Sequence, residues 1–140
     1  MIEVSMVPNG YIDTCWDKVE KFAAKATKYT FGRYTSDDIY DCVKEHDYQM
    51  WVAYEPSGEF KGIVVTNIVN YPKRKLLAMQ FCGGEDLKLW KDPMLELLKK
   101  FGAASGCDGI ESTGRPGWAK VFKEDGYKAT WVTYELPLGE

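Results

Sequence analysis

Cysteines, one histidine and a few carboxylates are the side chains of this chain that could carry covalent, metal or acid–base chemistry. The four cysteines form no C-x-x-C pair: Cys15, Cys42, Cys82 and Cys107. With His46 as the one histidine, this set lacks the ligand spacing of a zinc site, so we expect no metal, and free thiols in a reducing compartment. Cys82 alone stands at a predicted site, before Gly83 and Gly84. A small buried hydrophobe is the alternative for all four.

Carboxylates in two stretches are candidates for a general base. Glu111 lies in a predicted strand, whereas Glu85 and Asp86 lie between a predicted strand and the next helix. A base works best when its pKa lies near the working pH, which depends on burial and on neighbouring charges. His46 lies in a charged stretch and is instead expected on the surface near a helix end. Glu111, Glu85 and Asp86 therefore stay open as candidates for the catalytic base.

Hydrophobic periodicity predicts how these residues are positioned: a single α/β (α+β) domain over residues 1–140, with a mixed sheet of about six strands and four helices. Strands are predicted at residues 2–7, 48–55, 60–70, 76–82, 107–113 and 128–136. Helices are predicted over residues 12–26, after a capping box at residues 35–38, from residue 93 to 105 and over residues 117–125. The order is β-α-α-β-β-β-α-β-α-β, in which residues 48–82 form an antiparallel meander.

The start of the third helix decides how the residues around it are read. Asp92 and Pro93 form an acidic N-cap followed by proline at the first helical position, so the helix is predicted to begin there. Trp90 then falls in the preceding loop. An exposed Trp90 would mark a contact surface; the alternative is that it covers the gap between the fourth and fifth strands. The other tryptophans are expected in the core: Trp16, Trp51, Trp118 and Trp131.

Residues 106–111 (GCDGIE) and 114–127 (GRPGWAKVFKEDGY) carry the most specific pattern of the chain. They resemble the strand, helix and glycine-aromatic finish of the GNAT acetyltransferase superfamily. More narrowly, the glycine-arginine-x-glycine-tryptophan turn resembles a phage-borne, acetyltransferase-like group related to the internal virion proteins of T7-like phages. The resemblance in element order covers nearly the whole chain, and the motif covers residues 106–127. It implies a GNAT-like fold.

The resemblance also implies acetyl-CoA as the cofactor, because GNAT enzymes bind its pyrophosphate on backbone amides of the loop after the fourth strand. The candidate cofactor contacts are Phe81, Cys82, Gly83, Gly84, Lys88, Arg115 and Trp118. Arg115 could bind a phosphate bidentately, or it could satisfy a nearby carbonyl or carboxylate. The tyrosine that often protonates the leaving thiolate falls on Phe122, which cannot donate a proton.

The predicted pyrophosphate loop departs from the pattern of the enzymes. It contains no G-x-G, and Pro93 has no N–H to offer to a phosphate. Glu85, Asp86 and Asp92 bring negative charge to a place where an anion would bind. Each of these residues is also an ordinary choice for starting a helix, and we prefer that interpretation.

Charge and hydropathy exclude some classes of partner. The chain has 18 basic and 21 acidic residues and a net charge of −3, which argues against nucleic acid as a partner. The one basic cluster, at residues 73–75, is interpreted as a solvated turn. No apolar run approaches the ~20 residues of a membrane span, and residues 1–8 do not resemble a signal peptide. We expect a soluble protein of the host cytoplasm, with the virion as the alternative location.

Three functions fit the sequence. One is an acetyl-CoA-dependent N-acetyltransferase, in which an amine attacks the thioester beside a strand amide near Phe81. Another is a GNAT-fold protein with a degenerate acyl-CoA site that acts as a binding or virion-associated factor, with a virion or host protein as partner. A third is a binder of another small molecule in the cleft between the fourth and fifth strands. The missing glycine loop and Phe122 favour the second function, since a fold does not fix an activity.

Overall fold

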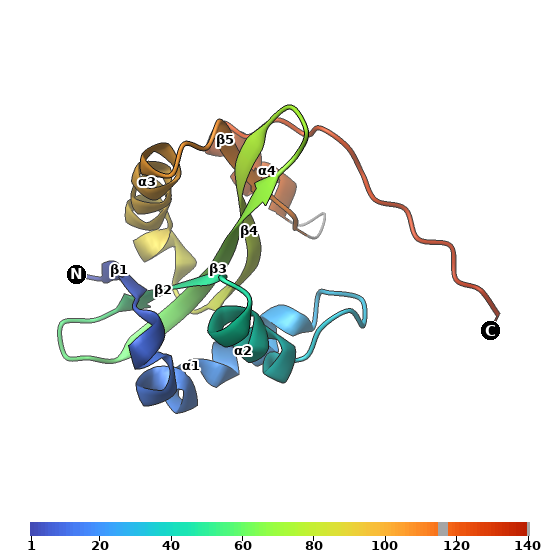
Figure 1. The fold of residues 1–140 in the computed structure, drawn as a ribbon. Helices are drawn as coiled ribbons and strands as arrows, with labels where there is room; N and C mark the ends of the chain where they lie inside the picture. The colour runs from blue at the N-terminus through green and yellow to red at the C-terminus, as the bar shows by residue number, and fades with distance from the viewer. Residues whose placement is uncertain (115–117, 140) are drawn as a thin grey trace.

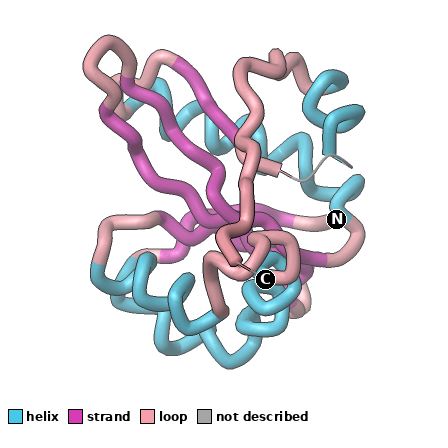
Figure 2. Tube along the Cα trace, turned by 90° about the vertical axis from the view of Figure 1, so that its right-hand side faces the viewer, coloured by secondary structure: helices cyan, strands magenta, loops and turns pink. Residues whose placement is uncertain are grey.

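The structure is a computed structural model that describes residues 1–114 and 118–139, with one mixed sheet between two layers of helices (Figures 1 and 2). The elements follow in this order: β1 (Glu3–Val7), the 3-10 turn η1 (Asn9–Tyr11), α1 (Ile12–Thr27), α2 (Ser36–Glu45), β2 (Gln49–Tyr54), β3 (Phe60–Asn70), β4 (Lys75–Gly84), α3 (Leu87–Ala104), β5 (Gly109–Ser112) and α4 (Ala119–Glu124). The sheet order is β1-β2-β3-β4-β5. β1 to β4 pair antiparallel, and β5 runs parallel to β4.

Each face of the sheet is buried by its own set of helices. One core lies between α1, α2 and the sheet residues Met50, Val52, Ile63, Val65 and Phe81. The other core lies between α3 and the sheet residues Trp51, Val64 and Leu77, and includes Trp90, Met94 and Leu98. Neighbouring strand residues fall in different cores because side chains alternate across a strand. This two-sided burial explains why β2 and β3 are nearly continuous apolar runs.

The helices on the first face confirm the sequence prediction closely. The buried side of α1 consists of Ile12, Trp16, Val19, Phe22, Ala23 and Ala26, which lie at helical spacing. α2 begins with the predicted capping box: the Thr35 hydroxyl accepts from the Asp38 N–H, and the Asp38 carboxylate accepts from the Thr35 N–H. His46 is the C-cap of α2 and is exposed, as predicted.

The predicted start of the third helix is wrong. α3 begins at Leu87 with Asp86 as its N-cap, so Asp92 and Pro93 lie inside the helix. Two residues join β4 to α3, and Asp86 makes the turn in the left-handed region at φ 52°. An aspartate tolerates the left-handed conformation better than most residues do. The N-cap at Asp86 was not predicted, because Asp92 and Pro93 carry a capping pattern of their own. Trp90 therefore belongs to the first turn of α3.

The predicted sixth strand, residues 128–136, is also wrong for the sheet as described, which has five strands. After α4 the chain runs away from the body of the molecule as an extended segment (Figure 1). Trp131, predicted in the core, is 78% exposed, and Tyr134 is 89% exposed. Alternating side chains favour an extended conformation. A strand of a sheet also needs a neighbouring strand to pair with, and residues 128–136 have none in the structure.

Two smaller boundaries differ from the prediction. β5 spans Gly109–Ser112, inside the predicted residues 107–113, and α4 spans Ala119–Glu124, inside the predicted 117–125. Residue 117 lies outside the described residues. Within the described chain, no helix is long and apolar enough to cross a membrane.

Candidate functional site

β4 and β5 part halfway along β4. Their pairing ends at Met79 and Ser112, whereas β4 continues to Gly84. A β-bulge lies at the same point: Thr66 of β3 pairs with Met79 and Val65 pairs with Phe81, so Gln80 has no partner residue. A bulge adds local twist and bends the strand, which turns the end of β4 away from β5. The predicted parting of the fourth and fifth strands is confirmed.

The space left by the parting, which we call the notch, is filled by side chains from four elements. β4 contributes Met79 and Cys82, and α3 contributes Trp90 and Met94. The other lining residues are Val64, Leu87, Lys91, Leu95, Leu98, Trp118, Val121, Phe122, Asp125 and Tyr127. The remaining cavity measures about 40 Å³. A single water needs about 10–15 Å³ of such volume, so the notch has room for a few waters and no larger molecule.

Trp90 is the more deeply buried of the two tryptophans that line the notch. It is 1% exposed, and its indole N–H donates to the Glu85 carbonyl at 2.8 Å. The ring lies against Gly62 of β3 and Gly84 of β4: a Cβ on these glycines would sit 2.5 Å and 3.0 Å from its Cζ2 atom. Real Cβ atoms do not approach a carbon that closely, so the ring needs glycine at position 62. The possibility of an exposed Trp90 is excluded: the ring packs on β3 and β4 and forms a wall of the notch.

An ion pair joins α3 to the end of α4 across the notch. Lys91 Nζ donates to Asp125 Oδ1 at 2.7 Å and to Asp92 Oδ1 at 3.0 Å. The side chains of Lys91 and Asp125 are 22% and 15% exposed, so the pair is partly shielded from water. The hydrogen bond to Asp125, followed by the one to Asp92, raises the pKa of Lys91. The ammonium therefore stays charged and holds α4 against α3.

Cys82 points into the notch but is not a nucleophile there. Burial raises the pKa of its thiol to about 12, so the reactive thiolate is not formed at neutral pH. The other thiols are also free, as predicted, and burial raises the pKa of Cys15 and of Cys42. By exposed area all four cysteines are half-buried, so the alternative of small buried hydrophobes holds in part.

Aromatic rings close the α4 side of the notch. Phe122 stacks on Trp118 with ring centroids 5.7 Å apart and packs against Tyr127 at 5.0 Å. The Tyr127 hydroxyl accepts from Ser112 Oγ at 3.0 Å. Burial is the main cause of a raised pKa of Tyr127. Sequence reasoning missed Tyr127, although its place directly after Gly126, at the end of the motif, was a usable signal.

The remaining predicted contacts do not converge on the notch. Phe81 points to the opposite face of the sheet, where its ring meets Tyr34 at 4.9 Å. At Gly83 the backbone of α1 comes so close that a Cβ would lie 2.2 Å from the Phe22 carbonyl oxygen. Lys88 is exposed. Arg115 lies outside the described residues.

Glu111, the candidate base, is held by a tyrosine. The Tyr71 hydroxyl, in the turn between β3 and β4, lies 2.6 Å from Glu111 Oε2 and 2.9 Å from Oε1. This hydrogen bond is the main cause of a raised pKa of Tyr71. The neighbouring Ile110 packs against the α3 core, so alternation places Glu111 on the other face of the sheet from the notch. Glu111 therefore acts as an anchor for the β3–β4 turn.

Two amides at the connection from β4 to α3 are already hydrogen-bonded. The Glu85 N–H donates to the Lys61 carbonyl at 2.7 Å, and the Leu89 N–H donates to the Asp86 carbonyl at 2.9 Å. Lys61 Nζ lies 3.7 Å from the Asp86 carboxylate. Two residues lie between strand and helix, and both are acidic, so the connection places negative charge beside the start of α3, which opposes an anion there.

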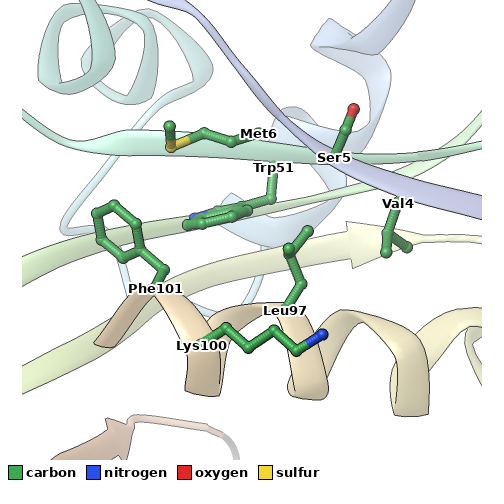
Figure 3. A pocket seen from close by; sticks show the side chains of 7 residues that line it. All are labelled: Val4, Ser5, Met6, Trp51, Leu97, Lys100 and Phe101. Atoms are coloured by element: carbon green, nitrogen blue, oxygen red, sulfur yellow. The ribbon is translucent and has the colours of Figure 1, made fainter. Parts of the chain in front are cut away.

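A second hollow lies between β1 and α3, away from the notch. It measures about 400 Å³ and is lined by Val4, Ser5, Met6, Trp51, Leu97, Lys100 and Phe101. Figure 3 shows the Trp51 ring at its centre, beside Phe101. The Lys100 ammonium is its one ionisable group. Nothing here could act as an acid–base pair, and no three potential metal ligands lie together anywhere in the described residues.

Comparison with solved structures identifies the fold. A candidate acetyl transferase from Pyrococcus furiosus is similar over 99% of this chain and 100% of its own, with a TM-score of 0.76 and 14% identity. An aminoglycoside acetyltransferase from an uncultured soil metagenomic sample covers 99% of both chains, with a TM-score of 0.71 and 13% identity. The fold is that of the GNAT acetyltransferases.

The GNAT fold extends over nearly the whole chain. The tetramutant of the BH1408 protein from Bacillus halodurans is a further similar structure, at a TM-score of 0.73 and 14% identity, covering 97% of this chain and 99% of its own. At this identity the likeness is one of architecture. No protein-family model and no curated protein matches the chain. The chemistry of the notch must therefore be argued from its own residues.

Proposed function

We propose that this chain is an acetyltransferase-like protein of the GNAT fold with a degenerate acyl-CoA site, and that it acts as a binding factor associated with phage virions. The observation that supports a degenerate acyl-CoA site is the filled notch: Trp90 occupies it, and Lys91 and Asp125 join its two walls. The resemblance of residues 106–127 to the phage-borne acetyltransferase-like group supports the role as a virion-associated binding factor. A virion or host protein is the proposed partner.

The volume of the notch is the main support for a degenerate site. An acyl-pantetheine arm must lie between the parted strands to present its thioester, and about 40 Å³ holds only a few waters. To admit the arm, Trp90 would have to leave a buried position with its indole N–H satisfied. Moving it would expose a large apolar ring and leave the Glu85 carbonyl without its donor, which opposes binding.

The chemistry of the walls supports the same conclusion. Phe122 stands where a proton donor is common in the superfamily, and its ring packs between Trp118 and Tyr127. Tyr127 has a hydroxyl, but the raised pKa makes it a weak acid near neutral pH. The thiol of Cys82 stays protonated for the same reason, its burial. Phe122 therefore cannot donate a proton, and burial makes the Tyr127 hydroxyl and the Cys82 thiol weaker acids than usual.

The alternative is an active acetyl-CoA-dependent N-acetyltransferase. Two features of the backbone favour it: the bulge at Gln80 and the parting of β4 from β5, which together form the place where such a fold exposes strand amides. The alternative requires that Trp90 and the pair of Lys91 with Asp125 move aside. A binder of another small molecule in the notch meets the same obstacle.

Thermal unfolding with acetyl-CoA separates the two functions. A ligand at 100 times its Kd stabilises the folded state by about 2.7 kcal/mol, so a millimolar addition reports even a weak site. We expect no change in the midpoint for the wild-type chain. A midpoint that rises and saturates with acetyl-CoA would overturn the degenerate site and support the enzyme.

The binding role needs its own test. Tagged protein is recovered from phage-infected cells and from purified virions. The proteins that copurify with it are compared with those that copurify with the tag alone. We expect the protein in particles, with a reproducible virion or host partner. Its absence from particles together with the lack of any enriched partner would contradict the proposal.

A further inference from the structure

The hollow between β1 and α3 has the size and the lining of a small-molecule site. Its volume of about 400 Å³ falls within the usual range of ligand pockets, roughly 300–1,000 Å³, and its walls are mostly apolar. It shares no lining residue with the notch, so it is a separate feature of the fold. Pockets of this kind hold the apolar body of a ligand and fix its orientation with a few polar groups.

The Trp51 ring at the centre of the hollow is fixed by a buried hydrogen bond. Its indole N–H donates to the Thr66 hydroxyl at 2.9 Å, and that hydroxyl donates to Gln49 Oε1 at 2.8 Å. Phe101 packs edge-on against the ring, with the ring centroids 5.2 Å apart. Because these contacts hold both rings in place, the hollow has a preformed apolar surface, which lowers the entropy cost of binding.

The remaining apolar walls come from β1 and from α3. Val4 packs on the α3 core, whereas Met6 is 43% exposed and can adapt its shape to a ligand. Figure 3 shows Leu97 and Phe101 rising from α3 towards the strands, so that they face the same space as Met6. The hollow therefore combines a fixed aromatic centre with an adaptable rim.

Lys100 supplies the charge of the hollow. It is exposed, and within residues 1–114 and 118–139 its ammonium makes no hydrogen bond or ion pair. The neighbouring Lys99 differs, because its ammonium pairs with Glu96 at 3.3 Å and it does not line the hollow. Figure 3 shows the Lys100 side chain running past Leu97, so its methylene groups extend the apolar wall while the ammonium stays in water. One unpaired ammonium beside an apolar surface is complementary to a ligand with one negative charge.

We propose that the hollow binds a small carboxylic acid whose aromatic or aliphatic body lies against Phe101 and Met6 and whose carboxylate pairs with Lys100. A ligand with more than one negative charge would bring unpaired charge to an apolar wall, because Lys100 is the one ionisable group among the described lining residues. A neutral ligand would fill the hollow without gaining the ion pair. This site goes beyond the proposed function and does not depend on whether the notch binds acyl-CoA.

A titration of the full chain with 4-phenylbutyrate, followed by ¹⁵N–¹H NMR, tests the site. This probe has an aromatic body, a short aliphatic chain and one carboxylate. We expect saturable shifts at millimolar probe for the amides of residues 4–6 and 97–101 and for the Trp51 indole N–H, with the amides of α4 unchanged. The alcohol 4-phenylbutan-1-ol has the same carbon skeleton and no charge, and it should bind about fivefold more weakly, which is the most that an exposed ion pair contributes.

Lys100→Met and Lys99→Met form a matched pair of variants. Each removes one exposed ammonium from the same turn of α3, and of the two positions only Lys100 lines the hollow. Lys100→Met should raise the Kd for 4-phenylbutyrate about fivefold and leave the Kd for the alcohol unchanged. Lys99→Met should leave both values unchanged. The amide spectrum of each variant shows in the same experiment that the fold is kept.

Three outcomes would overturn the carboxylate site. One is the absence of saturable shifts around the hollow in the wild-type chain at millimolar probe. Another is a set of shifts confined to the amides around the notch, which would place the ligand there. The third is equal affinity for the acid and the alcohol, or an equal effect of the two lysine substitutions, which would show that Lys100 does not recognise the carboxylate.

Discussion

At the scale of single residues, the small volume of the notch depends on the Trp90 ring and on the glycines against which it packs. Gly62 and Gly84 give the ring a flat surface on β3 and β4, and Glu85 gives its N–H an acceptor. The pattern around residue 90 could not predict this, because the glycines and the tryptophan lie on different elements. The sequence did predict Cys82 at the site, but its raised pKa is a consequence of burial that no local pattern shows.

Gly62→Ala tests the seat of Trp90. The new Cβ would lie 2.5 Å from the ring and 2.9 Å from the Gly83 carbonyl oxygen, so the ring or the strand must shift. Overpacking of this kind costs about 1–3 kcal/mol of the free energy of unfolding, measured by urea denaturation. Gly10→Ala is the control, since nothing lies within 4 Å of its Cβ. Equal stability of the two variants would contradict the packing described.

Cys82 gives the chain a dependence of stability on alkaline pH. Its pKa in the folded state, about 12, lies above the ordinary value of 9.0, so the folded state binds the proton more tightly than the unfolded chain. This contribution is complete below pH 9 and is lost as the pH rises from 9 towards 12, by at most about 1.4 kcal/mol per pH unit.

Cys82→Ala isolates that dependence from those of the tyrosines. The variant should lose stability less steeply than the wild type between pH 9 and pH 11, measured by urea denaturation at each pH. Cys107→Ala, at another half-buried thiol, serves as the control. Parallel curves for the wild type and Cys82→Ala would show that the thiol is not held in its neutral form.

At the scale of elements, α3 and α4 form two walls of the notch, and the ion pair of Lys91 with Asp125 joins them. α4 has six residues, and Lys91 of α3 fastens its end through Asp125. The sequence predicted both helices but set the start of α3 six residues late, because Asp92 and Pro93 imitate a cap. That shift placed Trp90 and Lys91 in a loop, so the ion pair of Lys91 with Asp125 was not predicted.

Lys91→Met should loosen α4 while keeping the bulk of the side chain. A partly shielded ion pair contributes up to about 1 kcal/mol, which corresponds to about a fivefold rise in the exchange rate of amides in α4. Hydrogen exchange with mass spectrometry measures it. Lys88→Met, on the same helix but exposed, is the control and should leave α4 unchanged. Equal exchange rates of the α4 amides in both variants would mean that the ion pair of Lys91 with Asp125 does not hold α4.

At the scale of the whole molecule, element order was the most predictable property. Meander strands and the two helices on the first face follow from periodicity and turn residues, which are local. The parting of β4 from β5 was expected from the resemblance to the GNAT superfamily. Residues 128–136 show the limit: their alternation predicts a strand, but pairing depends on an edge that the sequence cannot locate. Filling of the notch is likewise a property of four elements together, which no local pattern in the sequence shows.

Calorimetric titration of the wild-type chain with acetyl-CoA tests the closed notch most directly. With Trp90 buried and Lys91 bonded to Asp125, we predict no saturable heat of binding at millimolar ligand. Trp90→Ala, which removes a fully buried ring from the notch, shows whether that ring alone excludes the ligand. Saturable binding to the wild-type chain would contradict the account, because it would require a notch that opens and a cofactor site that still works.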